Sequence, residues 1–451
     1  MASEFESEVG RLMMGFHTPG VAVEMLAQGK RHSAHLGRLT ANGALPMTKM
    51  ARFSTMCLIK LLVNLNILML AEKGQIGLDD KIGDHLPELG KGSTAKGHFL
   101  KIRHLMSHTG GFRSYPLRPL LKLAQSWQSC VDLLHDSPQL FEPGKVFEDD
   151  HFSHIILGEL LSRLKGKPIL DIVCEEVLQP LGIAYSTRPK DAGSADIYVS
   201  RHDWNKEEKK WGPADDIYPD PDLTFGAISP LSMTSANLFH LGESLLADKP
   251  GAKDTVLSAA IKEQLFAGVV QVPREISPVR FSRWRLSAFG LGMATFRDGH
   301  QGFVTTGRGQ NSCMIFDKNR QSLVALAMNT MESAEREVLL NTLLAKFARD
   351  ASIVPYPTSL DISFDEFIHP FTTRDIAGAY MGFTPDPVEI YADPRSFIIR
   401  IGKEDRYQFE AGPENKLIMK ARLPTSVGVF QDPVSRKPCL TLSMHPHRKV
   451  A

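Results

Sequence analysis

The chain has 451 residues, which is enough for two or three domains of about 100–200 residues each. Its 52 lysine and arginine residues balance 51 aspartate and glutamate residues, and the formal charge is +1. This balance excludes proteins that bind nucleic acid or a membrane surface through a basic excess. The hydrophobic share of 43% and the charged share of 23% are typical of a globular protein.

The N-terminal residues and the cysteines indicate a compartment. The stretch 1–20 carries three acidic residues and lacks the unbroken apolar core of a secretory signal. The five cysteines are widely scattered and form no CxxC pair, so we expect neither a disulfide framework nor a zinc site. We therefore expect a cytoplasmic protein.

Along the first half of the chain, the sequence predicts a β-hairpin and then helices. A valine-rich run, a Gln-Gly-Lys turn and a second run predict a hairpin over 20–36. A long apolar segment predicts a helix over 55–73, and Lys60, Asn64 and Asn66 within it favour a buried helix over a membrane span. Helical spacing recurs over four later segments: 152–166, 168–182, 233–247 and 335–350.

The second half of the chain is richer in strands. Four short strands are predicted between residues 287 and 330, and helices flank them, which favours an α+β domain with an antiparallel sheet. From about residue 375 the pattern is strand and turn alone, which predicts a small β-barrel or sandwich.

The stretch ARFSTMCLIK, residues 51–60, carries the first candidate for chemistry. Unpaired backbone N–H groups and the helix dipole favour a thiolate at the start of a helix, and Cys57 has that place. Lys60 follows three residues later, on the same helix face. Taken alone, however, a cysteine in an apolar helix is usually a small hydrophobic residue.

Several ordered segments give the pattern a wider context. They are HTPGVAVEMLAQGK, MARFSTMCLIKLLVNLNILMLAEKGQIGLDD, KIRHLMSHTGGF, FEPGKVFEDDHFSHIILGELLSRLKGKP and TTGRGQNSCMIFDKNRQSLVALAMN. Over most of residues 10–350 the chain resembles the serine β-lactamase and penicillin-binding-protein superfamily, in its class C and esterase-like branch. The resemblance implies a β-lactamase-like sandwich with an antiparallel sheet over 1–352, a linker over 353–374 and a small lipocalin-like barrel over 375–451.

At the three catalytic motifs of this family the chain departs from the pattern. The Ser-x-x-Lys motif falls on Cys57-Leu58-Ile59-Lys60, where cysteine replaces serine. The Tyr-x-Asn motif falls on Asp149-Asp150-His151, and the third motif falls on Thr305-Thr306-Gly307. Because thiol, imidazole and carboxylate recur together in thiol acyl-transfer enzymes, we expect a rebuilt cysteine site rather than a decayed one.

Roles follow from this alignment. Cys57 is the expected nucleophile and His151 the expected general base, because imidazole titrates near neutrality. Asp149 would either orient His151 or contact Lys60, and Lys60 would support the thiolate electrostatically. By analogy with the family, the backbone N–H groups of Cys57 and Arg308 would form the oxyanion hole.

The remaining positions have open alternatives. Thr305, Thr306 and Gly307 would bind the substrate, although the two threonines could equally complete a sheet edge. His151 could be a surface histidine, and Asp150 is read as a solvated residue or a helix N-cap. His104 and His108 match a segment that is structural in the family.

We therefore expect a cysteine acyltransferase or acyl-hydrolase that forms a thioester acyl-enzyme on a small-molecule ester, thioester or amide, with specialised metabolism as one setting. Its partners would be a small-molecule acyl donor and acceptor, with a carrier protein as one acyl source, and neither nucleic acid nor membrane. No metal and no cofactor is implied, and the oligomeric state stays open. The alternatives are a silent binding scaffold and a non-covalent acid–base enzyme that uses Asp149 and His151.

Overall fold

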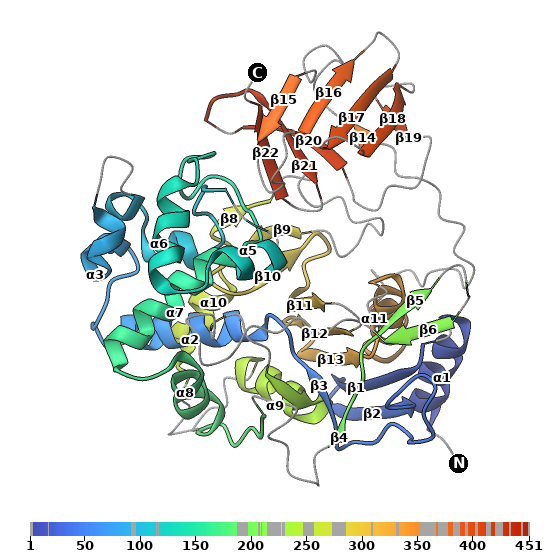
Figure 1. Ribbon diagram of the computed structural model, residues 1–451. Helices are drawn as coiled ribbons and strands as arrows, with labels where there is room; N and C mark the ends of the chain where they lie inside the picture. The colour runs from blue at the N-terminus through green and yellow to red at the C-terminus, as the bar shows by residue number, and fades with distance from the viewer. Residues whose placement is uncertain are drawn as a thin grey trace. The chain divides into compact units, whose positions relative to one another are not determined.

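The computed structural model (Figure 1) describes most of the first 350 residues and the strands that follow. The described ranges are 3–16, 18–91, 96–113, 115, 117–186, 197–205, 208, 210–213, 227, 231–246, 257–272, 286–307, 310–330, 333–350, 367–368, 378–381, 388–392, 396–401, 405–411, 416–419, 427–432, 434–442 and 445–449. The chain divides into two compact units, which we describe separately. The first comprises Met1–Gln75, Leu161–Ala267 and Gly292–Leu360, and the second comprises Ile76–Leu160, Gly268–Leu291 and Asp361–Ala451.

An antiparallel sheet forms the centre of the first unit. Its strands follow the order β2 (Lys30–Gly37), β1 (Gly20–Ala27), β13 (Ser322–Met328), β12 (Gln310–Asp317), β11 (Gln301–Gly307) and β10 (Ala294–Phe296). Every residue of β12 and β13 is buried, as expected for central strands covered on both faces. The predicted hairpin over 20–36 is confirmed. Positive φ angles at Gln28 and Gly29 form its two-residue turn, because such a turn matches the twist of the strands.

Helices cover both faces of this sheet. Alternate residues of a strand point to opposite faces. Leu36 contacts Gly10 in α1 (Glu4–Phe16), and α11 (Ser333–Phe347) packs beside α1 through an edge contact between Phe5 and Phe347, whose ring centroids are 5.0 Å apart. The register places Leu323 on the other face, where it contacts Gly242 of α9 (Ser235–Leu246).

Helix α2 (Leu58–Glu72) is the most buried helix of the site region. Every side chain over 58–70 is buried, which confirms the predicted buried helix over 55–73 with shorter ends. Helices α8 (Ile169–Val173) and α10 (Ala259–Phe266) pack against it, and α8 continues as a π-helical turn over Cys174–Leu178. Within the described residues, no helix is long and apolar enough to cross a membrane.

A small sheet leads into α2. Strand β3 (Ala51–Ser54) lies between β4 (Ile197–Tyr198) and β7 (Ser232–Thr234), and a separate hairpin joins β5 (His202–Asn205) to β6 (Lys210–Pro213). Three residues separate the end of β3 from the start of α2. The strand therefore fixes where the first turn of α2 starts.

The second unit combines short helices with strands. Its helices are α3 (Ile82–His85), α4 (Ile102–Met106), α5 (Leu117–Leu123), α6 (Trp127–Asp136) and the first turns of α7 (Phe152–Lys165), with 3-10 turns at Pro87–Gly90 and Lys96–His98. Strands β8 (Val270–Gln271) and β9 (Leu286–Phe289) pair with each other.

A C-terminal sheet completes the second unit. Its order is β14 (Phe367–Ile368), β19 (Lys416–Met419), β18 (Asp405–Ala411), β17 (Ser396–Ile401), β16 (Val388–Ala392), β15 (Gly378–Met381), β22 (His445–Lys449), β21 (Pro438–Leu442) and β20 (Val427–Gln431). The α+β fold with an antiparallel sheet and an all-β C-terminal part is confirmed. The described strands form an open sheet, because β14 and β20 stand at its two ends, so they do not close the expected barrel. The expected domain boundaries remain a prediction.

Candidate active site

Cys57 stands at the start of α2, as predicted. After β3, the backbone N–H and the hydroxyl of Thr55 both donate to the carbonyl of Leu231, at 2.7 and 2.9 Å. Met56 then adopts a φ of 47°, and Cys57 is the N-cap residue of the helix, with no capping hydrogen bond from its side chain. Cys57 therefore stands at the N-terminal end of the helix, where the helix dipole in general favours a thiolate.

The other described thiols differ from Cys57 in their environment. Cys57 is half-buried, whereas the remaining four cysteines are buried. Burial raises the pKa of Cys130 and Cys313 to about 12 and that of Cys174 to about 11. Such thiols stay protonated at neutral pH and are poor nucleophiles. Among these cysteines, exposure and helix position thus single out Cys57.

Lys60 lies one turn after Cys57 on the same face of α2. Its side chain is only 4% exposed, and its backbone N–H donates to the carbonyl of Cys57 at 2.9 Å. Asn64, a further turn along, is also buried. Burial of an ammonium group is costly unless polar groups compensate for it. The burial of Lys60 and Asn64 in this largely apolar helix therefore favours a functional role for them.

The third motif is joined to the first through Gln310. The Oε1 atom of Gln310 accepts the backbone N–H of Ser54 at 2.9 Å, and its Nε2 atom donates to the carbonyl of Val199 at 3.0 Å. Gln310 opens β12 and pairs with Gly307, so the end of β11 lies next to the strand that leads to Cys57. The sequence analysis missed Gln310, which follows the third motif by three residues.

The Thr305 side chain contacts the neighbouring strand β12. Its hydroxyl lies 2.8 Å from that of Ser312, its partner in β12, and both side chains are buried. This contact favours the reading in which Thr305 completes a sheet edge. The backbones of Thr306 and Gly307 pair with β12, and Arg308, the expected second donor of the oxyanion hole, lies outside the described residues.

The second motif lies in the second unit, directly before α7. Asp150 is confirmed as a cap of this helix, because its Oδ1 accepts the backbone N–H of Ser153 at 2.5 Å. Its Oδ2 lies 3.2 Å from Nδ1 of His108. The neighbouring Asp149 is half-exposed, with its Oδ1 3.9 Å from the same Nδ1, and His151 is half-buried.

His108 is a buried residue whose ring packs against the second motif, which is compatible with the structural role expected from the sequence. It is 5% exposed and holds a φ of 56°. Its ring lies 4.8 Å from the ring of His154 and contacts the edges of Phe147 and Phe289 at 5.9 and 5.3 Å. An imidazole beside a carboxylate is a general acid–base pair in many enzymes. No local spacing signals it, because 42 residues separate His108 from Asp150.

His104, in contrast, fits the structural reading. Its Nδ1 accepts the backbone N–H of Lys101 at 3.2 Å. Burial, with the nearby charges of Lys101 and Arg103, lowers the pKa of His104 to about 4. The ring is therefore neutral at pH 7 and serves as a local cap of α4.

The chain combines an antiparallel sheet between helical layers with a nucleophile-type residue and a lysine at the start of a buried helix. This combination is typical of the class of β-lactamase-fold hydrolases and acyltransferases. The family model "Beta-lactamase" matches residues 5–349. The chain belongs to this family.

Curated relatives and solved structures agree with this assignment. Penicillin-binding protein 4 of Amycolatopsis lactamdurans is 24% identical over 261 residues, which are 56% of this chain and 67% of the relative. Penicillin-binding protein 4* of Bacillus subtilis (strain 168) is 23% identical over 317 residues, 65% of this chain and 64% of the relative. The chain thus spans about two thirds of the length of either relative.

Among solved structures, SurE is similar with a TM-score of 0.75 at 17% identity, covering 99% of this chain and 98% of SurE. The octameric penicillin-binding protein homologue of Pyrococcus abyssi has a TM-score of 0.63 at 15% identity, with 98% and 99% covered. A class C β-lactamase has a TM-score of 0.60 at 15% identity, with 77% and 98% covered. At such identities these likenesses concern the fold.

Proposed function

We propose that the chain is a cysteine-nucleophile acyltransferase or acyl-hydrolase that works through a thioester acyl-enzyme. The observation that carries the proposal is the placement of Cys57, a half-buried thiol at the N-terminus of α2 with Lys60 buried one turn away. Membership of the β-lactamase family supports it, because Cys57-Leu58-Ile59-Lys60 is the segment of this chain that resembles the family's Ser-x-x-Lys motif.

The reaction would proceed in two balanced steps. In the first, Sγ of Cys57 bonds to the acyl carbonyl carbon, the bond from that carbon to the leaving oxygen, nitrogen or sulfur breaks, and the thiol proton passes through a base to the leaving group. In the second, water or an acceptor attacks the thioester carbon, the bond from that carbon to Sγ breaks, and the proton of the acceptor passes through the base to Cys57. By analogy with the family, the backbone N–H groups of Cys57 and Arg308 would stabilise the oxyanion.

The base is proposed to be an imidazole of the second motif. His151 of this motif is the preferred base, because imidazole titrates near neutrality, and Asp149 would be its orienting group. The buried pair of His108 and Asp150 gives the same segment a second imidazole with a carboxylate at 3.2 Å. Single replacements of the two histidines separate these assignments, because only loss of the true base would change the pH dependence of acylation.

The substrate class is proposed from three structures that share the fold. One is described as SurE with D-Leu, one as a D-stereospecific amidohydrolase from Streptomyces sp., and one as a β-lactamase/D-alanine carboxypeptidase from Pseudomonas syringae. We propose that this chain acts on small-molecule amides, esters or thioesters that carry a D-amino-acid residue at the scissile bond, with carrier-bound acyl thioesters as one donor type. Specialised metabolism is the proposed setting.

Two other functions remain as outcomes of the test. A silent scaffold would follow if the three altered motifs reflect loss of catalysis, and an acid–base enzyme would use Asp149 and His151 without acylation. Intact-protein mass spectrometry after incubation with D- and L-aminoacyl thioesters, amides and iodoacetamide distinguishes them. The wild type is compared with Cys57→Ala and with Cys130→Ala, which removes a buried thiol of raised pKa.

We expect one acyl adduct on the wild type and on Cys130→Ala, and none on Cys57→Ala. The D-acyl donors are expected to react faster than their L-isomers. Absence of any acyl adduct, with Cys57 alkylated no faster than a free thiol, would contradict the covalent mechanism. Turnover that survives Cys57→Ala would instead indicate acid–base chemistry.

A further inference from the structure

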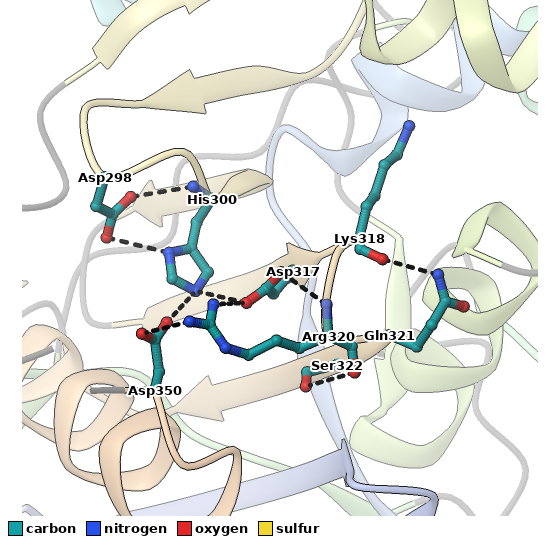
Figure 2. A network of polar contacts seen from close by, with 8 residues as sticks. All are labelled: Asp298, His300, Asp317, Lys318, Arg320, Gln321, Ser322 and Asp350. Atoms are coloured by element: carbon teal, nitrogen blue, oxygen red, sulfur yellow. Dashed lines mark hydrogen bonds and ion pairs between the residues drawn. The ribbon is translucent and has the colours of Figure 1, made fainter. Parts of the chain in front are cut away.

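A second cluster of chemically capable side chains lies in the first unit at one edge of the sheet (Figure 2). His300 precedes β11, Asp317 ends β12, and Asp350 follows α11. Their side chains are buried, at 3%, 7% and 1% exposed, respectively. Nothing in the proposed acyl-transfer reaction uses them.

The ring of His300 is oriented by a carboxylate. Asp298 accepts the backbone N–H of His300 through Oδ1 at 3.1 Å, and its Oδ2 lies 3.1 Å from Nδ1 of the His300 ring. This arrangement directs Nε2 toward the other two acids, at 3.5 Å from Oδ2 of Asp350 and 4.0 Å from Oδ2 of Asp317. A carboxylate beside the second ring nitrogen is common in the second shell of a metal-bound histidine.

The spacing of the three donor atoms fits a metal ion. One ligand atom from each of the three residues lies within 4.8 Å of the others. Ligands at about 2.0–2.2 Å from a tetrahedral Zn²⁺ are separated by roughly 3.3–3.6 Å. Side-chain rotations that shorten the longest of these separations by roughly 1 Å would therefore bring all three atoms to bonding distance.

The balance of charge points the same way. Three carboxylates, those of Asp298, Asp317 and Asp350, lie around His300, and the Arg320 guanidinium contacts two of them. Arg320 contacts Asp317 at 2.5 Å and Asp350 at 3.1 Å. A divalent ion beside a neutral His300 would place two positive charges among these acids, which lowers the cost of burying them.

We propose that His300, Asp317 and Asp350 form a binding site for a divalent metal ion of the Zn²⁺ type, with Asp298 as a positioning residue. Nε2 of His300 and one oxygen from each acid supply three ligands, and water completes the coordination. The Arg320 side chain, which is 42% exposed, swings toward solvent when the ion enters. The sequence predicts no metal site here, because the ligands come from three separate segments.

Metal binding to the full-length chain tests the proposal independently of catalysis. The protein is stripped with a chelator and titrated calorimetrically with Zn²⁺ alone, and its Tm is followed in parallel. The variants are His300→Ala, Asp298→Asn and Arg320→Gln. The matched control is His85→Ala, which removes a histidine whose Nε2 lies 3.0 Å from a carboxylate oxygen of Asp80.

We expect one equivalent of Zn²⁺ to bind the wild type and His85→Ala with the same affinity and to raise the Tm of both. His300→Ala should lose at least 100-fold in affinity. Asp298→Asn, which keeps all three ligands, should lose about 10–100-fold, and Arg320→Gln should bind at least as tightly as the wild type. Equal Zn²⁺ affinity of the wild type and Asp298→Asn would overturn the proposal. The absence of saturable binding in both the wild type and Arg320→Gln would do the same, and the cluster would then be a permanent ion-pair network.

Discussion

Gln310 bridges two parts of the sheet around Ser54: its Oε1 accepts the Ser54 N–H at 2.9 Å while its Nε2 donates to Val199 at 3.0 Å. Through this buried amide, Gln310, the first residue of β12, is bound to the strand before Cys57. The nucleophile segment and the third motif are therefore held together by a side chain that belongs to neither.

Replacement of Gln310 by methionine, which has a similar size, should lower the free energy of unfolding by about 1–3 kcal/mol, because two buried backbone groups lose their partners. Urea unfolding measures this change. Gln321→Met, at an exposed position, is the control and should have little effect. An equally small effect at Gln310 would mean that the bridge adds nothing to stability.

Asp150 combines a helix cap with a histidine contact, and two variants separate these roles. Asp150→Asn keeps an oxygen for the Ser153 N–H, whereas Asp150→Ala loses both contacts. We expect Asp150→Ala to cost about 1–3 kcal/mol and Asp150→Asn clearly less. The half-exposed Asp149 provides the control Asp149→Ala, for which we expect a change within about 0.5 kcal/mol. Equal losses in the two Asp150 variants would show that the cap is unimportant.

Glu337 should make stability depend on pH. Burial raises the pKa of this carboxyl to about 8, and the charge of Arg336 offsets only part of the effect. Between the ordinary value of 4.5 and about 8, the folded chain binds more protons than the unfolded chain, so stability falls as pH rises. From pH 5 to pH 7.5 this group should cost roughly 3 kcal/mol.

The variant Glu337→Gln removes the titration and keeps the shape of the side chain. Its stability at pH 7.5 should exceed that of the wild type, and the two should converge toward pH 5. Chemical unfolding at both pH values measures the difference. A parallel pH dependence in the two proteins would argue that Glu337 is not buried in its protonated form.

Gly242 allows α9 to approach the sheet closely. A methyl group at this position would lie 2.8 Å from Cδ2 of Leu323, which is too short for carbon atoms. Gly242→Ala should therefore cost about 1–3 kcal/mol through overpacking. Gly15→Ala in α1, which meets no atom within 4 Å, should instead stabilise the chain by up to about 1 kcal/mol. Thermal unfolding of both variants tests the contrast, and a tolerated Gly242→Ala would indicate looser packing.

Local patterns were enough to predict much of the fold. The turn glycine and the apolar run gave the hairpin over 20–36 and helix α2, and the place of Cys57 at the helix start followed from them. The open C-terminal sheet was expected as a barrel, because closure depends on which end strands pair and no local signal reports it.

The site residues also differ in whether local spacing or only tertiary packing brings them together. Cys57 and Lys60 lie within one helical turn, so spacing alone joins them. The contact of His108 with Asp150 and the cluster around His300 depend on tertiary packing. Strand register does offer one clue, because Gln301 pairs with Phe316, which places His300 opposite Asp317. An antiparallel register read from the sequence could have joined these two.

The burial of every side chain over 58–70 also bears on how this protein could change. A residue enclosed on all sides cannot alter its size without a compensating change in a neighbour, so single substitutions in α2 will rarely survive selection. New substrate preferences should therefore arise from variation outside this helix. A library for directed evolution would keep 58–70 and the proposed catalytic residues constant and would diversify partly exposed positions elsewhere.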